Sequence, residues 1–193
     1  LLTSSTYGGL FVYLALSSFA FINILQCSKA VYGAFMATLS LSYLIGTFFC
    51  RRWLPAHGLI GTVALAGRFS LAGGLYMAAI SLYSELFHLP AAWALLPGMW
   101  LYAFAHGIHQ PCGQTGVVSA FPQQAGAASA LSGFVLASAA FAVGLVLSQL
   151  TSLPPLAHSI HPMNLGMTLG GMSTAWVAFT LVRKHGLPPQ AAD

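Results

Sequence analysis

The sequence predicts an all-α integral membrane protein with six transmembrane helices. Apolar residues make up 58% of the 193 residues, and Asp, Glu, Lys and Arg together only 4%. The apolar residues are also gathered into six long runs. A soluble domain carries about 25% charged residues because its surface faces water. Because lipid-facing positions need no charge, a bilayer is the solvent that fits this chain.

The first three apolar runs approach the roughly 20 residues that a helix needs to cross the hydrocarbon core. The expected helices cover 7–25, 31–50 and 59–83. A short connection with Pro55 separates the second from the third, and proline ends or kinks a helix by removing a donor and crowding the preceding turn.

The last three expected helices are also bounded by prolines. They cover 92–119, 125–150 and 164–182, and they follow Pro90, Pro122 and the pair Pro154-Pro155. None of the connections is long enough to hold a soluble domain. We therefore expect residues 1–193 to form one six-helix transmembrane domain.

The few basic residues predict the orientation. With six spans, both termini lie on one side of the membrane, and that side holds four of the six basic residues: Arg51, Arg52, Arg183 and Lys184. The opposite side holds Lys29. The positive-inside rule therefore predicts that both termini are cytoplasmic. The basic residues form no patch, which argues against nucleic-acid binding.

Arg68 is the only charged residue well inside an expected span. A charge near the bilayer midplane costs at least about 2.5–3.5 kcal/mol on insertion scales, so such residues usually face a wet cavity or the bundle interior. Arg68 is therefore a candidate for a substrate cavity or a counter-ion role. The alternative is a structural anchor bonded to carbonyls of a neighbouring helix. No acidic residue lies within any expected span of the chain.

Three polar or soft side chains recur at three-residue spacing in the fourth expected helix: His106, His109 and Cys112. This spacing puts them on one broad helix face. A proton relay is one interpretation, because histidine titrates near neutral pH. A soft-metal site is a second, since imidazole and thiolate suit zinc or copper. The interpretation we favour is that these polar residues line a cavity or form hydrogen bonds between helices, without a resident metal or cofactor.

Four more residues are candidates for lining a substrate cavity. They are Asn23, Tyr43, Gln110 and Gln114. Each carries a polar group within or at the end of an apolar run. For Asn23, near the end of the first expected helix, contact with interfacial water is the interpretation we favour. The kink expected at Pro111 would make the fourth helix adaptable.

A stripe of small residues opens the fifth expected helix. Ser129, Gly133 and Ala137 are spaced by four, and small residues at this spacing allow two membrane helices to approach closely. We expect this face to pack against another helix.

The sequence argues against an enzyme. The only acids are Glu85 and Asp193, both outside the expected spans, so no paired carboxylates or Ser-His-Asp set can be assembled. A metal-dependent membrane enzyme using His106, His109 and Cys112 is the least favoured class. The three cysteines, Cys27, Cys50 and Cys112, form no close pair along the chain, and we expect them to be packing residues without disulfides.

One segment carries a family resemblance. The run Phe121-Pro122-Gln123-Gln124-Ala125-Gly126-Ala127-Ala128-Ser129-Ala130-Leu131-Ser132-Gly133 resembles the stretch between the tenth and eleventh helices of the Bcr/CflA drug-resistance exporters of the major facilitator superfamily. The opening at Tyr32-Gly33 and the exit at Arg51-Arg52 of the second expected helix fit as well. The residues of the motif that can be carried over are Pro122, Gly126, Ser129 and Gly133, and their role is helix packing.

The resemblance implies the second half of a proton-driven antiporter of a bacterial inner membrane, which exports drugs or small amphipathic compounds by alternating access. The fold would be one of two six-helix halves, each built from inverted repeats, with the substrate between the halves. The partners would be the bilayer, the small-molecule substrate, and an N-terminal six-helix half or a second copy. That first half is expected to be missing from this sequence. The alternative is a non-transporting membrane remnant or an interaction partner.

Overall fold

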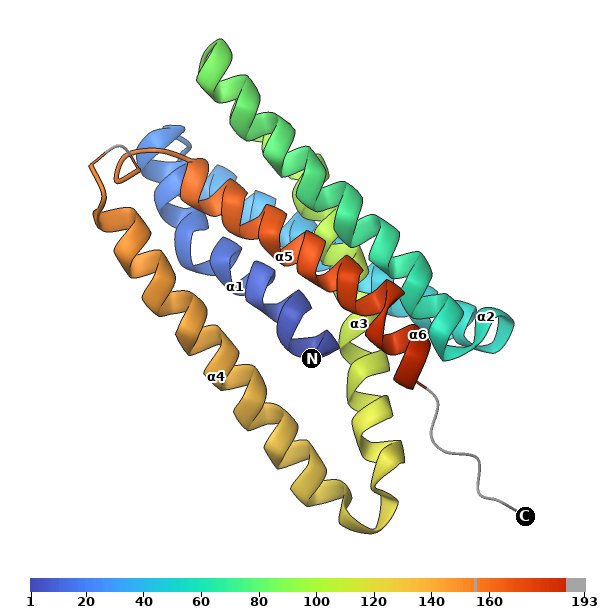
Figure 1. Cartoon of the computed structure of the whole chain (residues 1–193). Helices are drawn as coiled ribbons and strands as arrows, with labels where there is room; N and C mark the ends of the chain where they lie inside the picture. The colour runs from blue at the N-terminus through green and yellow to red at the C-terminus, as the bar shows by residue number, and fades with distance from the viewer. Residues whose placement is uncertain (155, 187–193) are drawn as a thin grey trace.

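The computed structural model describes residues 1–154 and 156–186, and every regular element in them is helical (Figure 1). The predicted all-α class is therefore confirmed for the described residues. The elements are α1 (Leu2–Ser18), the π-helix η1 (Phe19–Ile24), α2 (Lys29–Leu86), the short helix η2 (Ala92–Leu95), α3 (Leu96–Ala120), the short helix η3 (Pro122–Gln124), α4 (Ala125–Ser152), α5 (His161–Phe179) and α6 (Leu181–His185).

The longest element, α2, contains two helices that meet at Gly58. That residue has a φ of 65°, a left-handed value that glycine adopts without steric cost. Figure 1 shows the chain reversing direction at this bend. We refer to residues 29–57 as the first arm and to 59–86 as the second arm. The second helix was expected to end at residue 50, but the first arm continues through Pro55, and the chain turns at Gly58 instead.

Four helical stretches are long and apolar enough to cross a membrane. They cover Leu2–Ile24, Lys29–Leu86, Pro122–Ser152 and His161–His185. The chain is therefore a helical protein suited to a membrane, while the count of six crossings stays a prediction. Two features explain the difference in number. Both arms of α2 count as one stretch, and α3 carries polar residues that lower its apolar character, among them His106, His109 and Gln110.

Glycine residues allow the backbone of α3 to contact the backbones of both arms. A side chain at Gly107 would collide with the backbone of Tyr43 in the first arm. At Gly73 in the second arm, it would meet the backbones of Gly98 and Tyr102 in α3. Close backbone approach between membrane helices depends on small residues in this way. Helix α3 is thereby fixed between the two arms.

Helix α5 completes the compact part of the bundle, against α1 and the second arm. Its Gly170 lies against Gly9 of α1, and its Gly171 lies against the backbone of Ser70 and Gly74. The main buried cluster joins these helices through large side chains such as Tyr13, Phe21, Met77, Met99, Tyr102, Met163 and Met167. The core is therefore continuous from α1 through α2 and α3 to α5.

Helix α4 lies along the edge of the bundle (Figure 1). Leu147 is its one buried residue, although apolar side chains such as Leu131, Phe134 and Phe141 lie on its exposed surface. Its small-residue stripe is also uncovered: Ser129, Gly133 and Ala137 are exposed, and nothing lies within 4 Å of a Cβ placed on Gly126 or Gly133. Pro122 at the start of η3 is exposed too. No described helix covers the stripe of Ser129, Gly133 and Ala137. Close packing of another helix on it therefore stays a prediction.

Candidate functional site

His106 is the centre of a polar group between α1, α3 and the first arm. Its side chain is buried, and its Nδ1 lies 3.1 Å from the Oγ1 of Thr6. The ring of Tyr43 lies 5.6 Å from the imidazole, between centroids, and that of Tyr7 lies 6.3 Å away. Two of the predicted cavity residues, His106 and Tyr43, are therefore brought together by the fold.

Thr6 and Tyr7 were not predicted as members of this group. They precede His106 by about 100 positions, and no motif connects them. The position of α1 is further fixed by Tyr102, whose hydroxyl donates to the Thr6 carbonyl at 3.0 Å. Hence α3 contacts Thr6 of α1 twice: His106 meets the threonine side chain, and Tyr102 meets the threonine carbonyl.

His109 lies almost one turn further along α3 and is fully buried. Neither of its ring nitrogens has a hydrogen-bond partner among the described residues. The backbone of Ala66 in the second arm approaches the ring without reaching good hydrogen-bond geometry. His106 and His109 therefore face different neighbours, although they lie on one side of α3.

Several other polar atoms are buried in the bundle without a hydrogen-bond partner among the described residues. They are the Oε1 of Gln110, the hydroxyls of Thr62 and Ser70 in the second arm, and both amide atoms of Asn164 in α5. Most buried polar groups in proteins are paired, and each exception needs an explanation. Gln110, a predicted cavity residue, therefore belongs with His109 in a polar interior that sequence reasoning anticipated only in part.

Arg68 lies apart from this interior. Its side chain is exposed on the second arm. Within the residues that the structure describes, the one ion pair joins Glu85 to His161, so Arg68 has no carboxylate partner there. Arg68 thus lies on the outer surface of the bundle, at mid-helix.

The remaining two cavity candidates are also separate from His106. Asn23 is exposed at the end of η1, where its carbonyl accepts a hydrogen bond from Gln26 at 2.6 Å. Gln114 is half-buried one turn beyond Gln110 on α3. The contact with interfacial water considered for Asn23 agrees with this exposed position.

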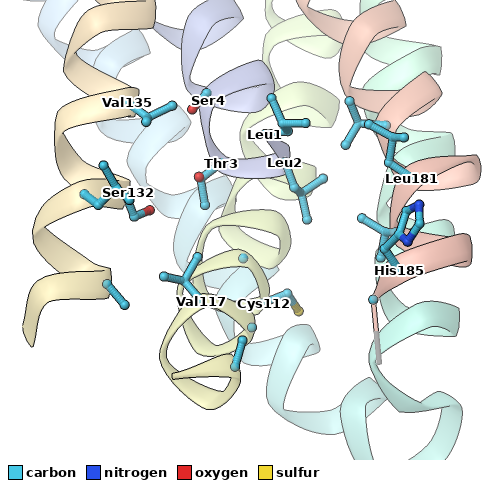
Figure 2. A pocket seen from close by; sticks show the side chains of 18 of the residues that line it. Leu1, Leu2, Thr3, Ser4, Cys112, Val117, Ser132, Val135, Leu181 and His185 are labelled. Atoms are coloured by element: carbon cyan, nitrogen blue, oxygen red, sulfur yellow. The ribbon is translucent and has the colours of Figure 1, made fainter. Parts of the chain in front are cut away.

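A pocket of about 610 Å³ opens where α1 begins, beside the ends of α3, α5 and α6 and the start of α4 (Figure 2). Ligand pockets commonly have volumes of about 300–1,000 Å³ and are mostly apolar with a few polar groups. Leucine and valine side chains dominate this lining, and polar groups come from residues such as Thr3, Ser132 and His185. Sequence reasoning did not find this pocket, because its lining comes from helices far apart in the sequence, including Leu59 and Val63 of the second arm.

Cys112 lines this pocket, and its Sγ lies 3.5 Å from the Sγ of Cys50 in the first arm. Both are free thiols. Although these two cysteines are far apart along the chain, they lie close together in the fold, because the bend at Gly58 lets the first arm pack beside α3. Among the described residues, no three His, Cys, Asp or Glu side chains gather as a metal cluster.

Comparison with known proteins adds no relative. No protein-family model matches the chain, and no significant match appears among the curated proteins or the solved structures.

Proposed function

We propose that the chain is one half, or a fragment, of a membrane transporter for small amphipathic compounds. The observation that carries this proposal is the set of polar groups buried between apolar helices: His106, His109 and the Oε1 of Gln110 on α3, and Thr62 and Ser70 on the second arm. Burying a polar group without a partner costs free energy. A bundle built only for packing would carry apolar side chains at these positions.

Helix α3 suits a moving part in this proposal. Pro111 interrupts its hydrogen bonds directly after Gln110, and Gly113 and Gly116 follow within two turns. Proline inside a helix removes a backbone bond and is a common cause of kinks. The polar side chains therefore precede a point at which α3 can bend, as alternating access requires.

Two surfaces support a second membrane component. Arg68 is exposed at mid-helix, where contact with lipid is unfavourable. The stripe of Ser129, Gly133 and Ala137 on α4 is open as well. An N-terminal six-helix half or a second copy would cover these surfaces. A carboxylate that pairs with Arg68 would have to come from the substrate or from another chain segment, because none of the expected spans contains one and Glu85, near the end of α2, pairs with His161.

Proton coupling, export and membership of the Bcr/CflA exporters rest on the sequence resemblance, which residues 121–133 carry mainly. In that proposal, the protein lies in a bacterial inner membrane with both termini cytoplasmic, and His106 is a candidate for the proton path. The C-terminal tail from residue 187 lies outside the described residues. The second candidate, an interaction partner without transport, is favoured by the large exposed apolar surface of α4.

The test is transport of ethidium, an amphipathic cation, in inverted membrane vesicles with an imposed pH gradient. The chain is supplied alone and, separately, in its complete native assembly, whose mass is measured at the same time. We expect gradient-dependent accumulation, which His106→Ala and Gln110→Ala reduce while Ser119→Ala, an exposed residue at the end of α3, leaves it unchanged.

The transport proposal fails if the native assembly moves neither ethidium nor other amphipathic cations. Equal transport in all three variants would remove the polar interior from the substrate path. A native assembly of mass 20.2 kDa would mean that six predicted helices act alone. A mass near twice that value would support a second half or a second copy.

A further inference from the structure

Two cysteines from different helices bring their sulfur atoms together inside the bundle. The Sγ atoms of Cys50 and Cys112 lie 3.5 Å apart, and each residue is 2% exposed. The third cysteine, Cys27, is half-buried and packs against the main buried cluster. The chain therefore offers one dithiol and one single thiol in the same molecule.

The separation of the two sulfurs is fixed by the backbone. Gly46 of the first arm lies against the carbonyl of Phe104, and Gly107 of α3 lies against the backbone of Tyr43. The contacts are so close that a Cβ at either glycine would collide with the opposing helix. Because Cys50 follows Gly46 by one turn and Cys112 follows Gly107 by somewhat more than one turn, these contacts hold the thiols in register.

One thiol of the pair, that of Cys112, borders the pocket at the start of α1. Cys112 is part of its lining, together with Leu2 and Val63, and Figure 2 shows its sulfur among the side chains that surround the space. The lining is mostly apolar, so an organic group bound at the sulfur would find a fitting environment there.

We propose that Cys50 and Cys112 form a binding site for trivalent arsenicals that carry one organic substituent. A centre bound to both sulfurs at about 2.3 Å, the length typical of a metal–thiolate bond, would have an S–centre–S angle of about 100°. This angle suits a pyramidal centre and excludes a linear one. Soft thiolate ligands select thiophilic elements.

The number of ligands favours the arsenical over zinc. Structural zinc takes four protein ligands, whereas the described residues hold no group of three candidate ligands. An arsenical R–As(OH)₂ needs two thiols. Two As–S bonds form, two As–O bonds break, and the thiol protons leave with the hydroxyls as two water molecules. Arsenic stays trivalent, so the step needs no oxidant, and the substituent R extends into the pocket.

The test uses phenylarsine oxide, whose hydrated form has this composition, with the full chain in detergent micelles. Intact mass spectrometry counts the bound arsenical after washing with excess monothiol. We expect one equivalent in the wild type and in Cys27→Ser. Retention falls by about 100-fold in Cys50→Ser and in Cys112→Ser, since closing the second bond makes the attachment intramolecular. Dimercaptopropanol, a competing dithiol, releases the adduct.

A second measurement needs no variant and covers the case in which a serine variant does not fold. The wild type is treated with phenylarsine oxide, alkylated with N-ethylmaleimide under denaturing conditions, and mapped by peptide mass. Cys50 and Cys112 should be protected and Cys27 alkylated. The proposal is overturned if Cys50 and Cys112 are alkylated as fully as Cys27, or if folded Cys50→Ser retains the arsenical like the wild type.

Discussion

His161 and Glu85 tie the start of α5 to the end of α2, with the imidazole Nε2 2.8 Å from the carboxylate Oε1. The other ring nitrogen, Nδ1, lies 2.6 Å from the Oγ of Ser81. His161 is largely buried, whereas Glu85 is 66% exposed. One imidazole therefore makes an inner and an outer contact, and their contributions to stability should differ.

Removing the outer contact should have a small effect. Glu85→Gln is expected to change the free energy of unfolding by no more than about 1 kcal/mol, because an exposed ion pair contributes little. His161→Phe should cost about 1–3 kcal/mol, since it leaves the Ser81 hydroxyl without its partner. Thermal unfolding in micelles, followed by circular dichroism, measures both. A larger loss for Glu85→Gln would contradict this ranking.

The glycine contact between α3 and the first arm predicts a second pair of results. Gly107→Ala should destabilise the protein by about 1–3 kcal/mol, because the new methyl group overpacks the backbone of Tyr43. Gly116→Ala is the matched control on the same helix, where nothing lies within 4 Å of the added atom. There we expect no loss, or a gain of up to about 1 kcal/mol from helix propensity. Equal losses at both positions would show that α3 is not fixed at Gly107.

The two buried histidines should respond differently to loss of polarity. Thr6→Val should cost about 1–3 kcal/mol, because it removes the hydrogen-bond partner of the buried His106 Nδ1. His109→Phe should be close to neutral in stability, since neither nitrogen of His109 has a partner to lose. Ethidium transport by the same folded variants then separates stability from function. Full transport by His109→Phe would exclude His109 from the path.

Arg68 should be more important for transport than for insertion. In the complete assembly, Arg68→Ala is expected to reduce flux by roughly tenfold or more, which corresponds to about 1.4 kcal/mol of a lost interaction. Its abundance in the membrane should be unchanged. Arg52→Ala, at an exposed position of the first arm, is the control for loss of one positive charge. Unchanged flux with reduced abundance would instead identify Arg68 as a structural anchor.

The predicted orientation can be tested by single cysteines in a chain that lacks the native three. Lys29→Cys and His185→Cys place exposed thiols at the start of α2 and at the end of α6. A membrane-impermeant maleimide should label the first in intact cells and the second only in inverted vesicles, as the positive-inside rule requires. The opposite pattern would reverse the orientation.

Local sequence signals predicted the helices well. Apolar runs predicted the all-helical class, although α1 begins at Leu2 where the pattern predicted residue 7, and the first arm continues through Pro55 where the pattern predicted a connection. What could not be predicted depends on distant contacts. The pairing of Thr6 with His106 and of Cys50 with Cys112 depends on which helices become neighbours, and apolar periodicity carries no such information. Arg68 shows the same limit. Its position in the middle of an expected helix could be predicted from the sequence, but whether its side chain faces the bundle interior or the outer surface could not.

The sparse attachment of α4 has a consequence for motion. Helices α1, α2, α3 and α5 are joined by glycine contacts and a shared core, so they should respond to force as a single stiff body. Helix α4 has one buried residue, and its contacts with α1 include Val143 near Gly8 and Gly144 near Phe11. Segments with few buried contacts open at the lowest free energy. Amide hydrogen exchange in micelles should therefore begin in α4 and reach the glycine-packed part of α3 last.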